Sequence, residues 1–155
     1  MHKKAEARVI DLSSEEAARL QAERFQRVRE AHQTELAEDY VELIADLIET
    51  LGEARVVDLA ARLGVSSATV NNALQRLQRD GLVSTKPYRS IFLTPQGQDM
   101  ALAARERHSV VREFLISLGV DAATADSDAE GIEHHVSKET LNAFRAHLRR
   151  HKRAK

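Results

Sequence analysis

The chain has 155 residues, a formal net charge of −1, 43% hydrophobic and 30% charged residues, and no cysteine. This length suits one compact domain or two small ones that share a core. The absence of cysteine excludes disulfides, a thiolate zinc site and a cysteine nucleophile, and it fits a reducing cytoplasm. No apolar run reaches the length of a membrane span and no signal peptide opens the chain. We therefore expect a helix-rich cytoplasmic protein with no membrane partner.

Charge is strongly segregated along the chain despite the near-neutral total. Residues 35–53 contain seven acids and no Lys or Arg, whereas residues 55–93 contain six bases and two acids. Residues 145–155 carry six bases and no acid. Local patches determine phosphate contacts, so the net charge does not exclude a nucleic-acid partner.

Residues 1–33 are predicted to form an N-terminal arm that is partly disordered or helical. The first eight residues are polar and basic, and we expect them to be disordered. Ser13 and Glu16 have the spacing of a capping box, which would open a charged helix towards Ala31. The apolar stripe of this helix is narrow, so the arm either packs on the main domain or lies in solvent.

The first strong helix is predicted from Glu35 to Leu51, with Gly52 as its stop. Its apolar residues recur at helical spacing and form a broad face: Leu36, Tyr40, Leu43, Ile44, Leu47, Ile48 and Leu51. Asp39 and Glu42 lie three residues apart beside this face. Taken alone, this carboxylate pair is most simply surface charge.

Two shorter helices follow, over residues 55–64 and from Ser66–Ser67 to a stop at Gly81. A Gly-containing turn joins them, which is typical of a helix-turn-helix, although an ordinary helical hairpin has the same pattern. The second helix exposes short hydroxyls and amides in its first turns, and these suit phosphates and base edges.

Residues 82–85 and 90–93 predict two short strands on either side of Lys86-Pro87-Tyr88-Arg89. A helix-turn-helix followed by a basic-tipped hairpin is a winged helix, whose wing contacts the DNA backbone or minor groove. The predicted partner is therefore double-stranded DNA. The predicted DNA-contacting residues are Ser66, Ser67, Thr69, Asn71, Asn72, Arg76, Lys86 and Arg89.

The C-terminal part predicts three further helices. A long helix over residues 95–118 contains His108, and a lone histidine there is more often a surface or core residue than a ligand. Asp121 is expected to cap the next helix and Ser137 the last one, which ends in a solvated basic tail at residues 149–155.

The organising feature is the string Glu130-Gly131-Ile132-Glu133-His134-His135. On a helix, Glu130, Glu133 and His134 would leave one face within one turn. Two carboxylates and an imidazole that converge in this way favour a bound cation. The alternative is a solvated acidic face with two exposed histidines, because a Glu-x-x-Glu-His string is short enough to occur by chance.

Together these features resemble the diphtheria-toxin-repressor family of metal-dependent transcriptional regulators, and in particular its manganese-responsive branch. The likeness rests on Asp-Tyr-Val-Glu at 39–42, the winged helix, Arg-His at 107–108 and Asp-Ala-Glu-Gly-Ile-Glu-His-His-Val-Ser at 128–137. It covers about residues 35–142 and leaves the first 33 residues outside.

The resemblance implies a mainly α homodimer. An N-terminal winged helix-turn-helix domain (34–103) would be followed by an all-helical dimerisation and metal-binding domain (104–149) and a basic tail (150–155). Metal binding is carried over to Asp39, Glu42, His108, Glu130, Glu133 and His134, as two adjacent Mn²⁺ sites per subunit. His135 would then lie around the site or at the surface.

The implied function is Mn²⁺-dependent repression at an inverted-repeat operator, in which metal fixes two recognition helices at about 34 Å. Oxygen donors with two imidazoles and no thiolate suit Mn²⁺, and Fe²⁺ is a credible second metal. Two other classes stay open: a metal-independent winged-helix regulator and a dinuclear metalloenzyme. We expect no enzymatic activity, because the sequence offers no separate nucleophile or substrate site.

Overall fold

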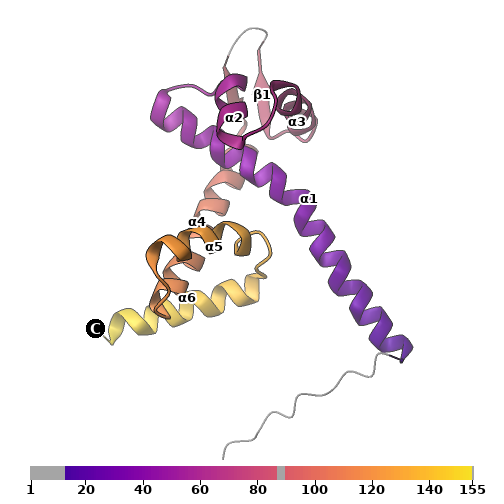
Figure 1. Cartoon of the computed structure of the whole chain (residues 1–155), viewed down its shortest axis with the longest axis vertical. Coiled ribbons are helices and arrows are strands. Elements are labelled where there is room, and N and C mark those ends of the chain that lie inside the picture. The colour runs from indigo at the N-terminus through magenta and orange to yellow at the C-terminus, as the bar shows by residue number, and fades with distance from the viewer. Residues whose placement is uncertain (1–12, 87–89, 155) are drawn as a thin grey trace, which may run out of the picture.

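The computed structural model describes residues 13–86 and 90–154. The elements run in the order α1 (Glu15–Leu51), α2 (Val56–Leu63), α3 (Ser67–Arg79), β1 (Val83–Thr85), β2 (Ile91–Leu93), α4 (Pro95–Ser117), α5 (Ala122–Ile132) and α6 (Lys138–Arg153). In Figure 1, α2, α3 and the hairpin gather around the C-terminal end of α1, while α4 leads to a second group formed with α5 and α6. The predicted fold class, a winged helix-turn-helix followed by a helical domain, is confirmed.

The helix α1 is longer than predicted, because the arm and the first strong helix form one continuous element without a break near residue 33. Its N-cap is Ser14, whose hydroxyl accepts a hydrogen bond from the Ala17 amide at 3.1 Å, so the predicted cap at Ser13 is wrong by one residue. Gly52 ends the helix at a φ of 81°, a conformation that glycine adopts without strain. The N-terminal half of α1 projects away from the winged helix (Figure 1).

Burial along the second half of α1 follows only part of the predicted apolar face. The fully buried residues on this stretch are Tyr40, Val41, Ile44 and Leu47. Leu36 and Leu51, at the ends of the predicted face, are exposed, whereas Val41 was not part of it. The reason is that α1 packs against α2 and β2 on one side and against α4 on another, so its buried surface is wider than one stripe.

The helix-turn-helix and the hairpin form as predicted. Gly64 ends α2, and the Ser66 hydroxyl caps α3 by accepting from the Thr69 amide at 3.1 Å. The strands β1 and β2 pair antiparallel, and the Ile91 amide also donates to the Ala54 carbonyl at 2.9 Å. Residues 87–89, the predicted wing tip, lie outside the described residues.

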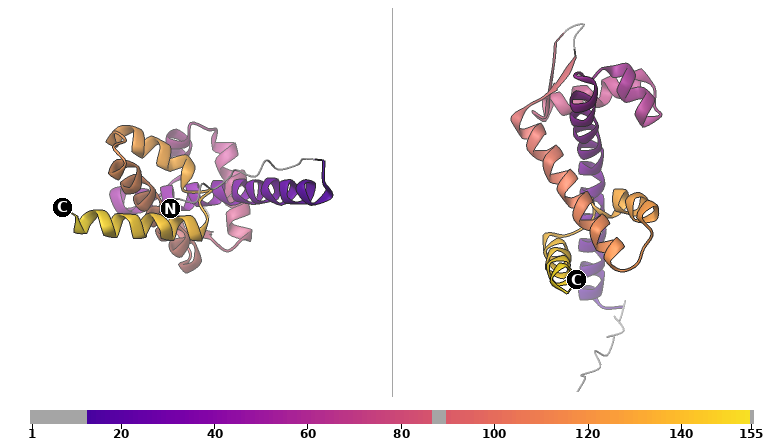
Figure 2. Two further views of the ribbon diagram at one scale, coloured as in Figure 1. Left: turned by 90° about the horizontal axis from the view of Figure 1, so that it is seen from below. Right: turned by 90° about the vertical axis from the view of Figure 1, so that its left-hand side faces the viewer.

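The start of α4 lies directly against the segment that leads into β1. Thr94 caps α4 and donates its hydroxyl hydrogen to the Gly81 carbonyl at 2.6 Å. A Cβ atom at Gly97 would lie 2.0 Å from the carbonyl oxygen of Leu82, so only glycine fits there. This contact fixes the direction in which α4 leaves the winged helix, beside α1 and towards α5 and α6 (Figure 2).

The second group of helices has a small core of its own. Val111, Ala129 and Leu141 are buried, and Phe114 stacks on Phe144 with ring centroids 3.8 Å apart. The predicted caps of α5 and α6 are confirmed, because their side chains accept the first amide hydrogens of each helix. No helix in the described part of the chain is long and apolar enough to span a membrane.

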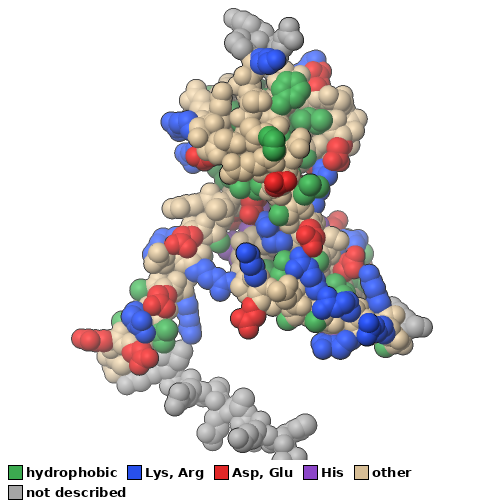
Figure 3. Space-filling model, turned by 180° about the vertical axis from the view of Figure 1, so that it is seen from behind, with side chains coloured by type: hydrophobic (Ala, Val, Ile, Leu, Met, Phe, Trp, Pro, Cys, Tyr) green, Lys and Arg blue, Asp and Glu red, His purple; other side chains and the backbone are tan. Residues whose placement is uncertain are grey.

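The basic C-terminal segment differs from the predicted frayed tail. The helix α6 continues through Arg153, and its last turn carries Arg150, His151, Lys152 and Arg153. Lys and Arg side chains gather along this end of the molecule (Figure 3). Cations in the last turn of a helix are favoured by the helix dipole, which explains why the helix extends this far.

Candidate metal centre

The Glu130–His135 string does not form one helical face, so that expectation is wrong. The helix α5 ends at Ile132, and residues 133–135 form a turn that leads to α6. Glu130 stays on α5 with 68% of its side chain exposed, whereas the side chains of Glu133 and His134 are 0% and 1% exposed. The physical reason is the short connection: Ser137 already caps α6, so the chain must leave α5 before another helical turn can form.

Glu133 is a buried carboxylate without a hydrogen-bond partner among the described residues. The imidazole nitrogens near it are Nε2 of His134, 3.5 Å from Oε1, and Nδ1 of His108, 3.6 Å from Oε2. Both distances are too long for good hydrogen bonds. Burial, and then the nearby charge of Glu42, raises the pKa of Glu133 to about 8. A divalent cation would relieve this unpartnered group.

The first group of converging ligand atoms belongs to His108, Glu130 and Glu133, whose atoms lie within 4.8 Å of one another. Nδ1 of His108 is 3.5 Å from Oε1 of Glu130. Its other ring nitrogen, Nε2, lies 3.2 Å from Asp126, which also accepts from Arg112 at 2.9 Å. A histidine held in this way by a carboxylate presents its free nitrogen in a fixed direction, as in many metal sites.

The second group contains Glu35, Asp39 and His134, again within 4.8 Å. The ring of His134 lies between two carboxylates of α1, with Nε2 at 3.1 Å from Asp39 and Nδ1 at 2.6 Å from Glu38. These two hydrogen bonds raise the pKa of His134 to about 10. In the metal-free protein His134 is therefore an imidazolium that joins α1 to the turn after α5.

Glu42 affects this centre through its charge. It stands outside the groups whose ligand atoms lie within 4.8 Å of one another in the described structure. Burial, and then the charge of Glu130, raises the pKa of Glu42, and Glu42 in turn raises that of Glu133. The structure thus brings Asp39, His108, Glu130, Glu133 and His134 into two groups joined by the Glu133–His134 contact, and it places Glu42 beside them.

Two residues of this centre were missed by the sequence analysis. Glu38 accepts from His134 and pairs with Arg107, whose Nη2 lies at 2.8 Å. Burial opposes the ionisation of Glu38, but its bonds to His134 and Arg107 outweigh this and lower its pKa. A signal for Glu38 was present, because the acidic run 35–53 places Glu35, Glu38 and Glu42 at i, i+3 and i+7 on one helix face.

Most of the predicted DNA-contacting residues lie on α3. Ser67, Thr69, Asn71, Asn72, Arg76 and Lys86 are exposed. The hydroxyl of Ser66 is engaged, since it caps α3 and lies 2.9 Å from that of Thr69. Arg89 lies outside the described residues. The helix α3 therefore presents a polar and basic surface to solvent.

Most of the described chain matches known protein families. Residues 32–91 match the family model of the iron dependent repressor N-terminal DNA binding domain, and residues 94–154 match that of the iron dependent repressor metal binding and dimerisation domain. The chain is 56% identical over 129 residues to the transcriptional regulator MntR of Escherichia coli O6:H1, covering 83% of each chain. It is 42% identical over 105 residues to the HTH-type transcriptional regulator MntR of Listeria monocytogenes serotype 4a, covering 68% of this chain and 74% of that one.

Solved structures with the same fold include a manganese-dependent transcriptional repressor in complex with manganese. It has a TM-score of 0.66 and 32% identity, and the match covers 72% of this chain and 52% of that chain. The manganese regulator SloR has a TM-score of 0.64 and 26% identity, over 73% and 53% of the two chains. The chain thus spans about half the length of these solved structures.

Proposed function

The chain belongs to the iron-dependent repressor family of metal-dependent, DNA-binding transcriptional regulators, and from that premise we propose that Mn²⁺ is its co-repressor. Of the solved structures named above, one is a manganese-dependent repressor in complex with manganese and the other is a manganese regulator. Because the family consists of transcriptional repressors, the expectation that the chain is not an enzyme is confirmed.

The observation that carries the proposal is the buried, unpartnered carboxylate of Glu133 between two imidazoles. Two adjacent sites would be held by this carboxylate with His108, Glu130 and Glu42, and by Asp39 with His134. The donors are oxygen and imidazole nitrogen, without thiolate, which suits Mn²⁺ and also admits Fe²⁺.

A divalent ion supplies positive charge at this point, which allows neighbouring carboxylates to be ionised together. The chain's own residues set the consequence. Asp39 and Glu42 lie on α1, which forms part of the winged-helix core, while His108 lies on α4 and Glu133 on the turn after α5. Fixing these side chains together fixes the winged helix relative to the dimerisation domain.

Metal binding would regulate how α3 is placed in the major groove of the DNA. In a homodimer, two copies of α3 about 34 Å apart would meet successive major grooves of an inverted repeat. Ser67, Asn71 and Asn72 would contact the DNA from the first turns of α3, with Ser66, Thr69 and Arg76 beside them, and Lys86 and Arg89 would contact the backbone from the wing. A coupling of about 1–3 kcal/mol between metal and DNA is enough to change affinity about 5- to 150-fold.

The test is the substitution Glu133→Gln, which keeps the size of the side chain and removes its charge. DNA fragments selected from a random library by the native protein with Mn²⁺ serve as the probe, and fluorescence anisotropy measures binding. We expect Glu133→Gln to lose most of the Mn²⁺-dependent gain in affinity while it remains a dimer by sedimentation. The matched control is Glu139→Gln, an exposed glutamate in the first turn of α6.

Two outcomes would overturn the proposal. Full Mn²⁺-dependent binding by Glu133→Gln would remove this carboxylate from the metal centre. Equal binding by the native protein with Mn²⁺ and with chelator would indicate a metal-independent regulator. Titrations with Mn²⁺, anaerobic Fe²⁺ and Zn²⁺ separate a manganese sensor from an iron sensor, and the symmetry of the selected DNA tests the inverted repeat.

A further inference from the structure

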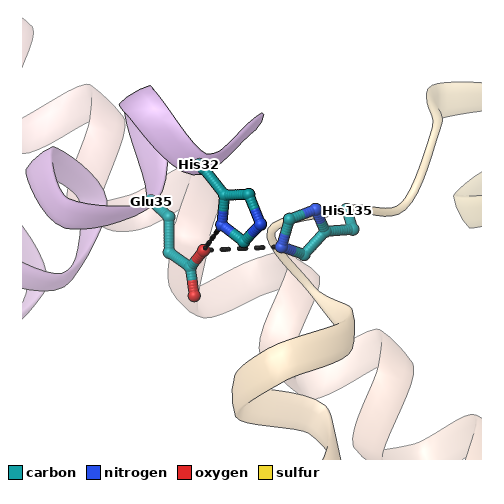
Figure 4. Close-up of side chains that lie close together, drawn as sticks. All are labelled: His32, Glu35 and His135. Atoms are coloured by element: carbon teal, nitrogen blue, oxygen red, sulfur yellow. Dashed lines mark hydrogen bonds and ion pairs between the residues drawn. The ribbon is translucent and has the colours of Figure 1, made fainter. Parts of the chain in front are cut away.

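A third group of ligand atoms lies beside the proposed manganese sites and shares Glu35 with the second group described above. His32 and Glu35 on α1 meet His135 on the turn after α5 (Figure 4), with ligand atoms within 4.8 Å of one another. We propose that His32, Glu35 and His135 bind a borderline divalent cation, of which Zn²⁺ is the leading example. This goes beyond the proposed function, which needs neither histidine.

The distances fit a tetrahedral ion. Nδ1 of His32 lies 3.1 Å from Oε2 of Glu35, and Nε2 of His135 lies 3.4 Å from the same oxygen. Ligands bound to zinc at about 2.0–2.1 Å in a tetrahedron are about 3.4 Å apart. All three ligand atoms lie within 4.8 Å of one another, so small side-chain movements would bring them to one ion.

The rings are oriented for ligation rather than for stacking. Their centroids are 4.9 Å apart and their planes meet at 72°, so one ring presents its edge to the other. Figure 4 shows a nitrogen of each ring directed at the carboxylate of Glu35. These two nitrogens and the carboxylate oxygen would supply three ligand atoms to one ion.

The donor set selects the class of cation. Two imidazoles and one carboxylate suit zinc, cobalt, nickel or ferrous iron better than calcium or magnesium, which prefer oxygen ligands throughout. The side chains of His32, Glu35 and His135 are 63%, 29% and 33% exposed, so water can complete the sphere. Arg24 and Arg27 line the cleft beside His135, and their charge would weaken cation binding there.

The position of the group gives the site a structural role. Glu35 is also within ligand reach of Asp39 and His134, and His135 directly follows His134. A cation here would tie α1 to the same turn that carries Glu133, one helical turn before the proposed manganese centre. We therefore expect its binding to stabilise that turn.

The experiment counts metal equivalents in the double variant His32→Ala/His135→Ala. Zn²⁺ is titrated by calorimetry, and Co²⁺ is used as a probe whose visible absorption reports coordination. We expect the variant to bind one equivalent fewer per chain than the native protein and to lose the corresponding Co²⁺ bands. His151→Ala, a histidine of α6 outside the group, is the control and should keep the native stoichiometry.

Mn²⁺-dependent DNA binding of the double variant is measured in parallel, and we expect it to stay within about threefold of the native value. Because the proposed manganese ligands are untouched, failure of one proposal does not imply failure of the other. If the double variant binds as many Zn²⁺ ions as the native protein, the proposed zinc site is wrong. The three residues then form only a hydrogen-bonded group. His32→Ala alone, on an exposed part of α1, guards against a folding defect and should lower the Zn²⁺ affinity by at least tenfold.

Discussion

Two regions of the molecule are held together by different kinds of interaction. One is the winged helix, and the other is the joint, where α1, α4 and the turn after α5 meet. Among the described residues, thirteen buried residues form the winged-helix core, whereas three form the core between α4, α5 and α6. Between the two cores lies Glu133, the one buried charged residue in the described part of the chain. Apolar packing is always present, but the state of a buried carboxylate depends on protons and cations.

This difference fits the proposed function, in which one part of the molecule responds to metal while the other stays constant. The DNA-reading surface rests on residues such as Leu59 and Val70, whose burial does not change with pH or with metal. The joint contains Glu133 and His134, both with strongly shifted pKa values. The proposed metal centre therefore lies in the region with the weaker apolar core.

The largest expected effect is on metal affinity. The pKa of Glu133 is raised to about 8 and that of His134 to about 10, so both groups carry a proton at pH 6–7. Metal must displace these protons, so its affinity should rise with pH by up to about a hundredfold per unit between pH 6 and 8. Calorimetry in buffers of different ionisation enthalpy should find about two protons released per chain. No release would contradict the assignment of these ligands.

The next effect is on the stability of the metal-free protein. The folded pKa of Glu133 lies above its ordinary value of 4.5, so the folded state binds the proton more tightly than the unfolded state. Its contribution to stability is complete below about pH 4.5 and is lost as pH rises through about 8. The melting temperature should fall over this range, and less so in Glu133→Gln. Equal slopes in the two proteins would show that another group is responsible.

A third experiment targets the contact between the two parts. Gly97→Ala would place a Cβ atom 2.0 Å from the carbonyl oxygen of Leu82, so α4 must shift. We expect a loss of about 1–3 kcal/mol in the free energy of unfolding, measured by urea denaturation. The control is Gly131→Ala in α5, which meets no atom within 4 Å and should gain about 0.5–1 kcal/mol. A neutral Gly97→Ala would indicate that α4 is not fixed by this contact.

The smallest effect concerns the winged helix alone. Lys86→Ala should weaken DNA binding on all sequences and reduce the slope of log affinity against log salt by about 0.9. The metal titration midpoint should be unchanged, because Lys86 is remote from the metal centre. Lys138→Ala, at the start of α6, is the control for a change of one surface charge. An unaltered slope would remove Lys86 from the phosphate contacts.

Much of the fold was predictable because its signals are local. The caps at Asp121 and Ser137 act within three residues, and each appears where the sequence places it. The continuity of α1 was not predictable in the same way. No proline or glycine interrupts residues 15–51, but the weak apolar stripe of the first half gave no reason to join it to the second.

The candidate site was predictable in outline only. The residues themselves offered Asp39 with Glu42 and the Glu130–His134 cluster, while His108 entered through the family resemblance. The end of α5 at Ile132 turned one predicted face into two groups, since a helix assumption cannot foresee where tertiary packing redirects the chain. Glu38 and Arg107 were missed because their part depends on which side of α1 meets His134, a contact between residues 96 positions apart.

The uninterrupted α1 has a mechanical consequence. A helix of 37 residues is about 55 Å long, and without an internal glycine or proline it bends little. The proposed metal ligands Asp39 and Glu42 lie about two-thirds of the way along it, and the winged helix lies at its C-terminal end. A tilt of about 5° about Asp39 would displace Leu51, about 18 Å further along the helix, by about 1.6 Å. Small shifts of Asp39 and Glu42 would therefore also move the DNA-contacting surface of α3.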